Sequence, residues 1–524
     1  MIPYLSTSSF IALVVTAVIV VASIVWVVLY QKKRQPLPPY SSASMRDNFE
    51  ASGVQKSLFQ LERYRKFIHE IKQGQFGSTV LGSTFRLRVP FVNPWIFTTD
   101  YVLARSVLAG NSKLGILEGE RSQLVKFNFL DRNEHNLLTY LTSNKEREKA
   151  RKDIAQAFST SNLLHAWPSI RTVITDQFAV LRAHAAKGTV VDVKSTIVLF
   201  FMRTLSRGAF GVDFTDDGTE NEHNINGLAY LQAFEDCGRE RARQFMFPLR
   251  RFMFWEESVK RSEAAEKELR RMAEKILTLH QHDKEETKKR GESHLKPITV
   301  LDHVAHHVYS KEITRLSDVT LFSFAGIDTT SHTFCFFIME LSRHPQVQSR
   351  LQEELARFMP PLPSGRFEYS ASNEKEMLSA IAGCEYLGYC VREVMRLWPV
   401  AASGPGRELL EDVEYGGMCL PKGSLVVAQL YSMFRERWID RPEEFIPERW
   451  AESNPQLPQL KEMMMPFGLG KRNCIGQNMA MFQLKIVAAH FLHYFDFELA
   501  CVPTFEYFVT LKPDDLRMRV SERV

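Results

Sequence analysis

One segment near the carboxyl end constrains the fold more than any other part of the chain: residues 467–476 read Phe-Gly-Leu-Gly-Lys-Arg-Asn-Cys-Ile-Gly. Residues 477–494 carry apolar side chains at helical spacing, so we predict a helix there. Cys474 then lies just before a helix N-terminus, where the helix dipole and unpaired N–H groups favour a negatively charged sulfur. The glycines around it allow tight turns and the close approach of a flat ligand. The alternative is a small apolar core residue, the commoner role of a cysteine.

The composition is that of a globular protein. Of 524 residues, 45% are hydrophobic and 24% are charged, which suits one large domain or two to three ordinary ones. The net charge of +5 is small and no compact basic motif accompanies it, so we expect no nucleic-acid partner. The seven cysteines form neither a Cys-x-x-Cys pair nor a Cys/His zinc pattern. This predicts free thiols in a reducing compartment.

The amino-terminal residues predict a membrane anchor. Phe10 to Leu29 is an uncharged, apolar run of about the length that spans a bilayer as a helix. Basic residues 32–34 follow it directly and none precede it, so the rest of the chain should lie in the cytoplasm. A cleaved signal peptide fits less well, because the run is long and its basic flank is on the other side. We therefore assign residues 1–30 to the anchor and residues 31–45, with three prolines, to a stiff basic hinge.

The remainder of the chain reads as mostly helical, with small β-sheets. Helical periodicity dominates after residue 101, while short β-branched stretches bounded by Gly and Pro predict strands. The clearest segments are a β region at 82–99, an amphipathic helix at 263–280, a charged loop at 283–296, a long apolar helix at 317–344 and short strands at 413–427.

Residues 467–476 resemble the signature Phe-x-x-Gly-x-Arg-x-Cys-x-Gly of the cytochromes P-450. The matching positions are Phe467, Gly470, Arg472, Cys474 and Gly476. The resemblance implies that the chain binds haem b with Cys474 as the axial thiolate ligand, which favours cleavage of the O–O bond. It also implies that Arg472 pairs with a haem propionate and that Phe467 shields the sulfur.

A second motif lies within the long apolar helix, where residues 325–330 read Ala-Gly-Ile-Asp-Thr-Thr. Taken alone it is ambiguous, because each threonine could bond to the carbonyl four residues earlier and bend the helix. It also resembles the oxygen-binding helix motif of the same family. That resemblance implies that Thr329 hydrogen-bonds the activated dioxygen and that Asp328 relays protons from solvent.

Glu393 and Arg396 are three residues apart, which places them on one helix face. By itself this spacing predicts no more than a surface ion pair of little energetic value. The continuation Leu-Trp-Pro, and the later Pro-Glu-Arg-Trp at 447–450, resemble two further segments of the family. They imply a buried charge network of Glu393, Arg396 and Arg449 that stabilises the haem-binding core.

The resemblance to the cytochromes P-450 implies that two more arginines bind the haem propionates. Arg407 lies on a predicted strand eleven residues after Arg396, one residue further than the usual spacing. Arg151 occupies the arginine position of a helix in which a Trp or His four residues earlier also contacts the haem. This chain has Arg147 there, so the resemblance leaves that first contact open.

The same basic helix has a second interpretation. Most of its lysines are expected to be solvated, but Lys149, Lys152 and Lys471 are candidates for a basic patch on the thiolate side. An acidic reductase or cytochrome would dock there by charge steering. The aromatic stretch 244–255 also has two interpretations, interior packing or a membrane-facing cap over a substrate channel.

Together these motifs imply a cytochrome P-450 fold over residues 46–524. The implied activity is insertion of one oxygen atom into a lipophilic substrate. Electrons would come from NADPH through a separate NADPH-cytochrome P-450 reductase, with cytochrome b5 as a further partner. The implied location is the endoplasmic-reticulum membrane, with a single span and a cytoplasmic catalytic domain. Two alternatives stay open, a relative that isomerises or dehydrates without consuming oxygen and a non-enzymatic haem-binding protein.

Overall fold

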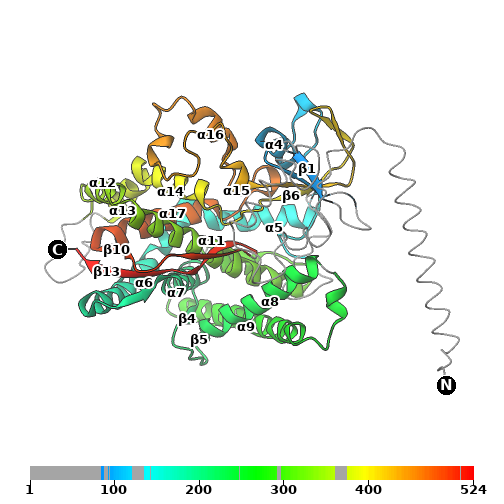
Figure 1. Ribbon diagram of the computed structural model, residues 1–524. Coiled ribbons are helices and arrows are strands. Elements are labelled where there is room, and N and C mark those ends of the chain that lie inside the picture. Colours follow the sequence, from blue (N-terminus) through cyan, green and yellow to red (C-terminus); the bar gives the residue numbers. More distant parts are fainter. Residues whose placement is uncertain are drawn as a thin grey trace, which may run out of the picture.

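The computed structural model describes residues 84–87, 93, 95–120, 135–141, 143–246, 248–291, 297–359, 374–507 and 509–523. Helices surround a long central helix, and short sheets lie at the margins (Figure 1). This confirms the prediction of a mostly helical fold with small sheets. The predicted span Phe10–Leu29 lies outside the described residues. Within those residues, no helix combines the length and apolar character that crossing a bilayer requires.

The α-helices of the described residues are α4 (Tyr101–Ala109), α5 (Lys145–Ala155), α6 (Thr160–Lys187), α7 (Val193–Leu205), α8 (Gly227–Met246), α9 (Glu257–Lys289), α10 (Val300–His306), α11 (Glu312–Arg343), α12 (Pro345–Leu355), α13 (Glu374–Gly383), α14 (Glu385–Leu397), α15 (Leu430–Met433), α16 (Leu457–Met463) and α17 (Gln477–Tyr494). Shorter turns of 3-10 helix are η1 (Ser112–Leu114), η2 (Gln156–Phe158), η4 (Pro248–Phe252), η5 (Pro447–Trp450) and η6 (Gly470–Arg472), and η3 (Ser206–Phe210) is a π-helical turn.

The predicted helix at 477–494 is α17, with the same bounds, and the predicted helix at 317–344 is α11, which begins five residues earlier. The predicted loop at 283–296 is wrong over residues 283–289, because α9 continues to Lys289. Its charged side chains are good helix formers. One of them, Lys284, also holds α9 against α10, since its Nζ lies 2.8 Å from the Asp302 carboxylate. His280, one turn earlier on α9, contacts the same carboxylate through Nε2 at 3.1 Å.

The sheets join distant parts of the chain. The largest has the order β1-β2-β9-β6, and its central pair, β2 and β9, is parallel. A three-stranded sheet has the order β10-β13-β3, and β11–β12, β4–β5 and β7–β8 form pairs. The bounds are β1 (Thr84–Leu87), β2 (Trp95–Thr98), β3 (Val190–Asp192), β4 (Asp213–Thr215), β5 (Asn224–Asn226), β6 (Gly406–Glu408), β7 (Val413–Tyr415), β8 (Met418–Leu420), β9 (Leu425–Ala428), β10 (Phe495–Leu499), β11 (Thr504–Tyr507), β12 (Leu511–Asp515) and β13 (Arg517–Glu522).

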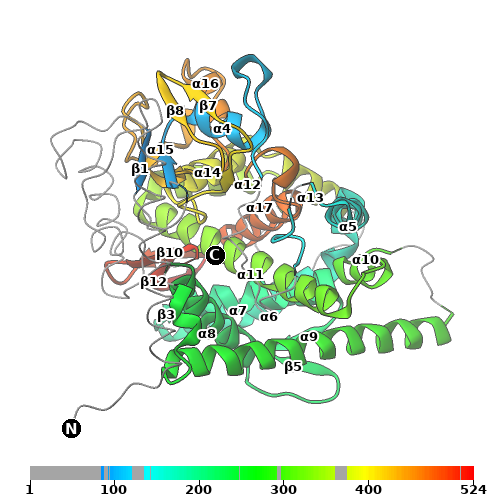
Figure 2. The same ribbon diagram turned by 90° about the vertical axis from the view of Figure 1, so that its right-hand side faces the viewer.

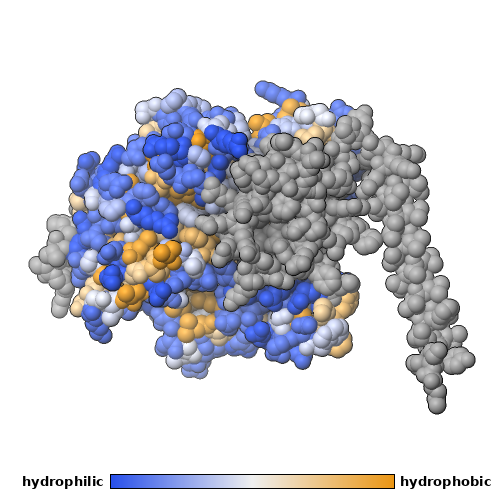
Figure 3. Space-filling view, viewed as in Figure 1, coloured by the Kyte–Doolittle hydropathy of each residue, from blue (hydrophilic) through white to orange (hydrophobic). Residues whose placement is uncertain are grey.

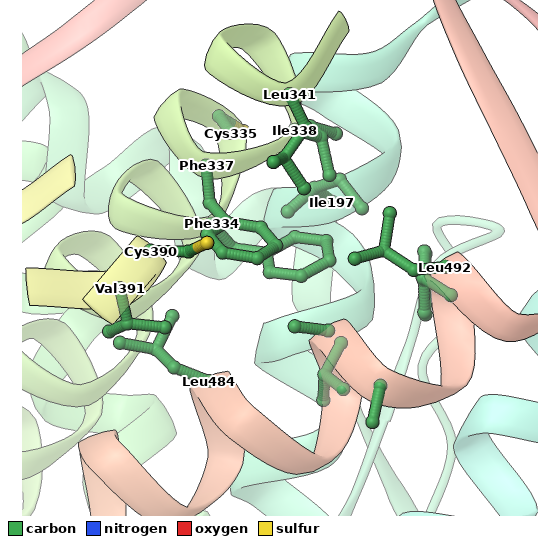
Figure 4. Close-up of a cluster of buried hydrophobic side chains, with 14 of the residues drawn as sticks. Ile197, Phe334, Cys335, Phe337, Ile338, Leu341, Cys390, Val391, Leu484 and Leu492 are labelled. Carbon is green, nitrogen blue, oxygen red and sulfur yellow. The ribbon is translucent and has the colours of Figure 1, made fainter. Parts of the chain in front are cut away.

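The main core lies where α6, α7, α11, α14 and α17 meet. Figure 4 shows side chains of α7, α11, α14 and α17 turned toward one another, with Phe334 among them. The Phe334 ring contacts Phe491 of α17 edge-on, with the ring centroids 5.3 Å apart. This packing fixes α11, which carries residues 325–330, against α17, which directly follows residues 467–476.

A second apolar cluster involves α8, α9, α10 and the first half of α11. Helices α8 and α9 lie side by side in both ribbon views, next to α11 (Figures 1 and 2). On the face shown in Figure 3, the described surface is mostly hydrophilic, and apolar residues gather in small groups. The apolar side chains of this second cluster pack α8, α9 and α10 against the first half of α11.

Candidate functional site

The segment around Cys474 is a compact loop between η6 and α17. The Cys474 N–H donates to the Phe467 carbonyl at 2.8 Å, which folds the loop back on itself. Gly470 has a positive φ of 69°, and a Cβ there would lie 2.4 Å from the Leu108 carbonyl oxygen. Only glycine therefore lets the loop lie this close to the end of α4. The neighbouring Lys471 N–H donates to Glu118 at 2.7 Å, which fixes the loop to the same region.

The Cys474 residue is exposed, although it lies within the fold. Desolvation by the surrounding protein raises the pKa of its thiol, while the Gly476 N–H and the charge of Arg151 act in the opposite direction. The helix N-terminus that the sequence argument invoked therefore does not by itself make the sulfur a thiolate. A metal ion displaces the proton of a thiol ligand. A bound metal would therefore stabilise the thiolate form of Cys474, which the protein environment alone does not favour.

Arg151, Arg147 and Arg472 all lie close to this loop. Arg151, on α5, donates to the Asn473 side chain next to Cys474. Arg147, one turn earlier and 2% exposed, donates to the Lys471 carbonyl at 3.4 Å. Arg472 donates to the Leu138 carbonyl at 2.6 Å. Three arginines thus contact the Cys474 loop and its surroundings, and the charge of Arg151 acts on the exposed sulfur itself.

Arg407 lies on β6, as predicted, and is 1% exposed. Its Nη1 donates to the Gly406 carbonyl at 2.9 Å. Phe467 is partly buried and packs against the main core. Gly476 is the N-cap of α17, and a Cβ there would lie 4.0 Å from the Cys474 sulfur. A side chain at Gly476 would therefore stand beside the sulfur.

The centre of α11 carries Asp328 and Thr329. The Thr329 hydroxyl donates to the Ala325 carbonyl at 2.7 Å, which is the backbone bond expected of an isolated threonine in a helix. The next such bond is made by Thr333, to the Thr329 carbonyl. Gly326 faces α7, because a Cβ there would come within 2.9 Å of the Leu205 side chain. Its missing side chain therefore allows α7 and α11 to approach closely.

Asp328 faces a different set of groups from Thr329. Its Oδ2 accepts a hydrogen bond from the Thr510 hydroxyl, and its Oδ1 lies 3.4 Å from His332 Nδ1. His332 is buried, and this burial lowers its pKa to about 4, so the imidazole is neutral at pH 7. Thr510 and His332 escaped the sequence analysis. Thr510 is 182 residues from Asp328 with no local motif, whereas His332 stands on the same helix four residues after Asp328.

These groups border an open cavity of about 380 Å³ between α7, α8, α11 and the turn before β12. Apolar side chains from α7, α8 and α11 form part of its wall, and Asp328, His332, Thr510 and Lys512 form another part. Lys512 is also paired with Glu235, at 3.2 Å. The cavity gives solvent a route to the Asp328 carboxylate.

Asp318, one of the buried acids of α11, has no role in the sequence analysis. Its carboxylate accepts the Leu137 N–H at 2.7 Å and the Tyr309 hydroxyl at 3.0 Å. Burial raises its pKa to about 7, although both hydrogen bonds act against this. Leu137 belongs to the segment whose carbonyls Arg472 contacts. Asp318 thus ties α11 to the neighbourhood of the Cys474 loop.

The structure brings Glu393, Arg396 and Arg449 together in the interior. Arg396 donates to the Glu393 carboxylate at 2.9 and 2.8 Å, and Arg449 donates to it at 3.1 Å. The three side chains are 0%, 0% and 3% exposed. The Trp450 indole N–H adds a fourth contact with Glu393, at 2.9 Å. This is a buried network and not a surface pair.

The same network also binds the backbone of residues 434–444, which precede Arg449 in the chain. Arg396 also donates to the carbonyls of Phe434, Pro442 and Glu444, at 2.8, 2.7 and 3.0 Å. A buried guanidinium is satisfied only when most of its five donors have acceptors. The network therefore joins α14 to residues 434–450, which lead into the Cys474 segment.

Comparison with known proteins identifies the family. The Cytochrome P450 family profile matches residues 58–516, so the chain belongs to the cytochrome P450 family. The chain is 27% identical to cytochrome P450 3A28 of Bos taurus over 380 residues, which cover 68% of each chain. It is 28% identical to cytochrome P450 3A5 of Homo sapiens over 377 residues, covering 68% of this chain and 69% of that protein.

The fold agrees with a solved structure. The crystal structure of a cytochrome P450 designated CYP102L1 superposes with a TM-score of 0.67 at 20% identity, covering 84% of this chain and 95% of that one. This likeness establishes the fold. The family consists typically of haem-thiolate monooxygenases, which agrees with an exposed cysteine that has an arginine close by.

Proposed function

We propose that the protein is a haem-thiolate monooxygenase that inserts one atom of dioxygen into a lipophilic substrate. The observation that carries the proposal is the exposed Cys474, at the start of α17, with arginines from α5 and the Cys474 loop beside it. One thiol and several guanidiniums match an iron porphyrin with two carboxylates, because thiolates bind iron and guanidiniums bind carboxylates in pairs of hydrogen bonds.

In this proposal Cys474 is the axial ligand, and Arg151, Arg407 and Arg472 hold the propionates. Haem with a thiolate ligand, when bound, supplies the activation of dioxygen. Phe467 shields the sulfur, Gly476 keeps the space beside the sulfur free of a side chain, and Gly470 lets the loop lie against the end of α4. Arg151 and Arg472 now donate to Asn473 and to Leu138, and these neutral acceptors can give way to a carboxylate.

The chain itself would deliver the protons. The Thr329 hydroxyl, now bonded to the Ala325 carbonyl, can turn to donate to the oxygen substrate. Asp328 would resupply that proton from the open cavity, where its carboxylate already meets Thr510. A hydroxyl and a carboxylate on neighbouring residues are suited to this general acid role.

The Cys474 side of the molecule is the proposed docking face for an electron donor. Lys149, Lys152 and Lys471 are exposed, and Arg147 links their two segments through its bond to the Lys471 carbonyl. An acidic NADPH-cytochrome P-450 reductase, or cytochrome b5, would be attracted to this face by charge.

We also propose an endoplasmic-reticulum location, with residues 1–30 as the anchor, 31–45 as the hinge and 46–524 as the catalytic domain. Phe252, Phe254 and Trp255 support a membrane contact, because their side chains are 57%, 69% and 61% exposed. Such exposed aromatic groups next to Arg251 are suited to a bilayer interface. Interior packing, the other interpretation of this stretch, does not hold for these three residues.

Spectroscopy of the full-length protein tests the ligand. The reduced protein with CO should show the red-shifted Soret band of a thiolate-ligated haem, and Cys474→Ala should lose it. Cys501→Ala, which removes another free cysteine, should keep the band. A wild-type protein without this band, or a Cys474→Ala protein that retains it, would contradict the assignment.

Turnover distinguishes the alternatives. Membranes with a competent reductase and the host's lipid extract should show NADPH-dependent oxygen uptake matched by an oxygenated product. Product formation without oxygen uptake would favour an isomerase or dehydratase. A complete lack of turnover would favour a haem-binding protein without enzymatic activity.

A further inference from the structure

The hairpin of β11 and β12 lies beside α8 and α11, next to the open cavity that Asp328 borders (Figure 2). Its two strands pair antiparallel, with Glu506 opposite Lys512. Thr510, the last residue before β12, contacts Asp328 and is only 7% exposed. The proposed monooxygenase reaction assigns no role to the Thr510 hydroxyl. The contacts of the hairpin with α8 and α11 indicate one.

Alternating charges fasten this hairpin to α8. Lys512 Nζ lies 3.2 Å from the Glu235 carboxylate on α8. One turn further along α8, Arg239 donates to both oxygens of Glu506, at 2.7 and 3.3 Å, and it lies 3.6 Å from Glu235 as well. The side chains of Arg239, Glu506 and Lys512 are 23%, 14% and 10% exposed, so salt screens these pairs less than pairs on the open surface. The charges therefore hold the hairpin, and Thr510 with it, in a fixed position against α8.

The Thr510 hydroxyl orients the Asp328 carboxylate. It donates a hydrogen bond to Oδ2 of Asp328. The other oxygen, Oδ1, lies 3.4 Å from His332 Nδ1, which is beyond the usual length of an N–H···O bond. His332 is also neutral at pH 7, because burial lowers its pKa to about 4, so it brings no charge to the carboxylate. Of these two neighbours, Thr510 is therefore the one that fixes the direction of the carboxylate.

The direction of this carboxylate matters because a competing partner lines the same cavity. Lys512 borders the cavity together with Asp328, and it carries a positive charge. Without the Thr510 hydroxyl, the carboxylate would be free to turn toward Lys512, whose side chain now pairs with Glu235. A carboxylate held in an ion pair is poorly placed to receive a proton from solvent and to pass it to Thr329, since proton transfer requires hydrogen-bond reach.

We propose that Thr510 is a positioning residue for proton delivery, which keeps the Asp328 carboxylate available to solvent in the open cavity and does not itself touch the reacting atoms. This role rests on the proposed monooxygenase function. In that reaction NADPH, one proton, dioxygen and substrate give NADP⁺, oxygenated product and water. When the O–O bond is not cleaved, the same two electrons and two protons leave with dioxygen as hydrogen peroxide, and the substrate is unchanged. Thr510 should therefore lower the share of NADPH that ends as hydrogen peroxide.

Hydrogen peroxide formed per NADPH consumed tests this role, in membranes that hold the full-length protein with its haem, a competent reductase and the host's lipid extract. Thr510→Val keeps the shape of threonine without its hydroxyl. The ratio should rise at least about twofold in this variant, since correctly placed proton donors typically contribute about 10²- to 10⁴-fold to a rate. Thr510→Ser keeps the hydroxyl and should stay close to the wild type. The control Thr504→Val removes an exposed hydroxyl of the same hairpin, which accepts the Asp515 N–H at 3.2 Å, and should change nothing.

Thermal unfolding provides a readout of the hydrogen bond that does not depend on turnover. Thr510→Val should lower the melting midpoint of the wild-type protein by more than it lowers that of Asp328→Ala, because two residues that share a hydrogen bond do not contribute additively to stability. Equal shifts in the two backgrounds would show that the Thr510 hydroxyl does not hold Asp328, and would overturn the proposal.

The outcomes separate this role from the monooxygenase function itself. A wild-type protein without the thiolate-haem band, or without NADPH-dependent oxygen uptake, overturns both. If the wild type turns over and Thr510→Val, with an intact band, forms no more hydrogen peroxide per NADPH, the positioning role alone is overturned. The same holds if Thr510→Ser forms as much hydrogen peroxide as Thr510→Val, because the missing hydroxyl would then not be the cause.

Discussion

Replacing Glu393 with alanine should destabilise the protein far more than the loss of an exposed ion pair of the same spacing. The Glu393 carboxylate accepts bonds from Arg396, Arg449 and the Trp450 indole, and Oε1 also accepts the Ile446 N–H at 3.2 Å. The Arg396, Arg449 and Trp450 donors are buried, so each loses an acceptor that bulk solvent does not readily replace.

The expected magnitude follows from the charges left behind. Removing one partner of a buried ion pair typically costs about 3–5 kcal/mol, and here two guanidiniums lose their counter-charge. Arg396 keeps three backbone carbonyls, which limits its loss. We therefore expect a cost within that range, a large part of the ~5–15 kcal/mol by which most proteins are stable.

Urea unfolding at equal protein and haem concentrations measures the effect. The matched control is Glu268→Ala, because Glu268 pairs with Arg271 at 2.7 Å and at the same three-residue spacing. That pair is 37% and 46% exposed, so its loss should cost no more than about 0.5 kcal/mol. Glu393→Gln retains the shape and one acceptor oxygen and should fall between the two.

A similar urea midpoint for Glu393→Ala and Glu268→Ala would refute the reasoning. It would mean that Arg396 and Arg449 are satisfied by backbone carbonyls alone. The network would then not be needed to hold residues 434–450 against α14.

Two further predictions concern the loop and Asp318. Gly470→Ala should lower the haem content per folded chain, because its Cβ would meet the Leu108 carbonyl at 2.4 Å, whereas Gly115→Ala, also at positive φ but in open space, should retain haem. Equal haem content in the two variants would contradict this. Burial raises the pKa of Asp318 to about 7, so the folded state binds the extra proton and this residue's contribution to stability falls as pH rises from about 4 to 7. In urea titrations the free energy of unfolding of Asp318→Asn should therefore rise relative to that of the wild type as the pH increases from about 4 to 7. If the two proteins show the same dependence of this free energy on pH, Asp318 does not titrate in that range.

The sequence predicted helices well where apolar residues recur on one face of the helix. The bounds of α17 follow from its apolar periodicity, and α11 was predicted to within a few residues at each end. The failure at 283–289 has a simple cause. A charged stretch indicates a loop when read alone, but α9 gains partners from α10 through Asp302, and no local pattern reveals that contact.

In the candidate site, too, residues within a local motif could be predicted, whereas residues brought together only by the fold could not. Residues 467–476 and 325–330 have motifs that resemble a known family, so Cys474, Asp328 and Thr329 could be named in advance. Thr510, which bonds Asp328, and Leu137, which bonds Asp318, are far away in sequence and carry no motif. Their positions follow from the packing of the whole chain, which a local pattern does not encode.

The parallel pairing of β2 with β9 has a consequence for how the protein is made. Trp95 pairs with Leu425, so the partner of β2 emerges from the ribosome about 330 residues later. At roughly 5–20 residues per second, that delay is about 15 to 65 s. Until then one edge of β2 has no strand to pair with, and an open apolar edge promotes aggregation. Synthesis therefore passes through an interval in which this edge of β2 is open, and Cys474 is added only after the partner strand β9.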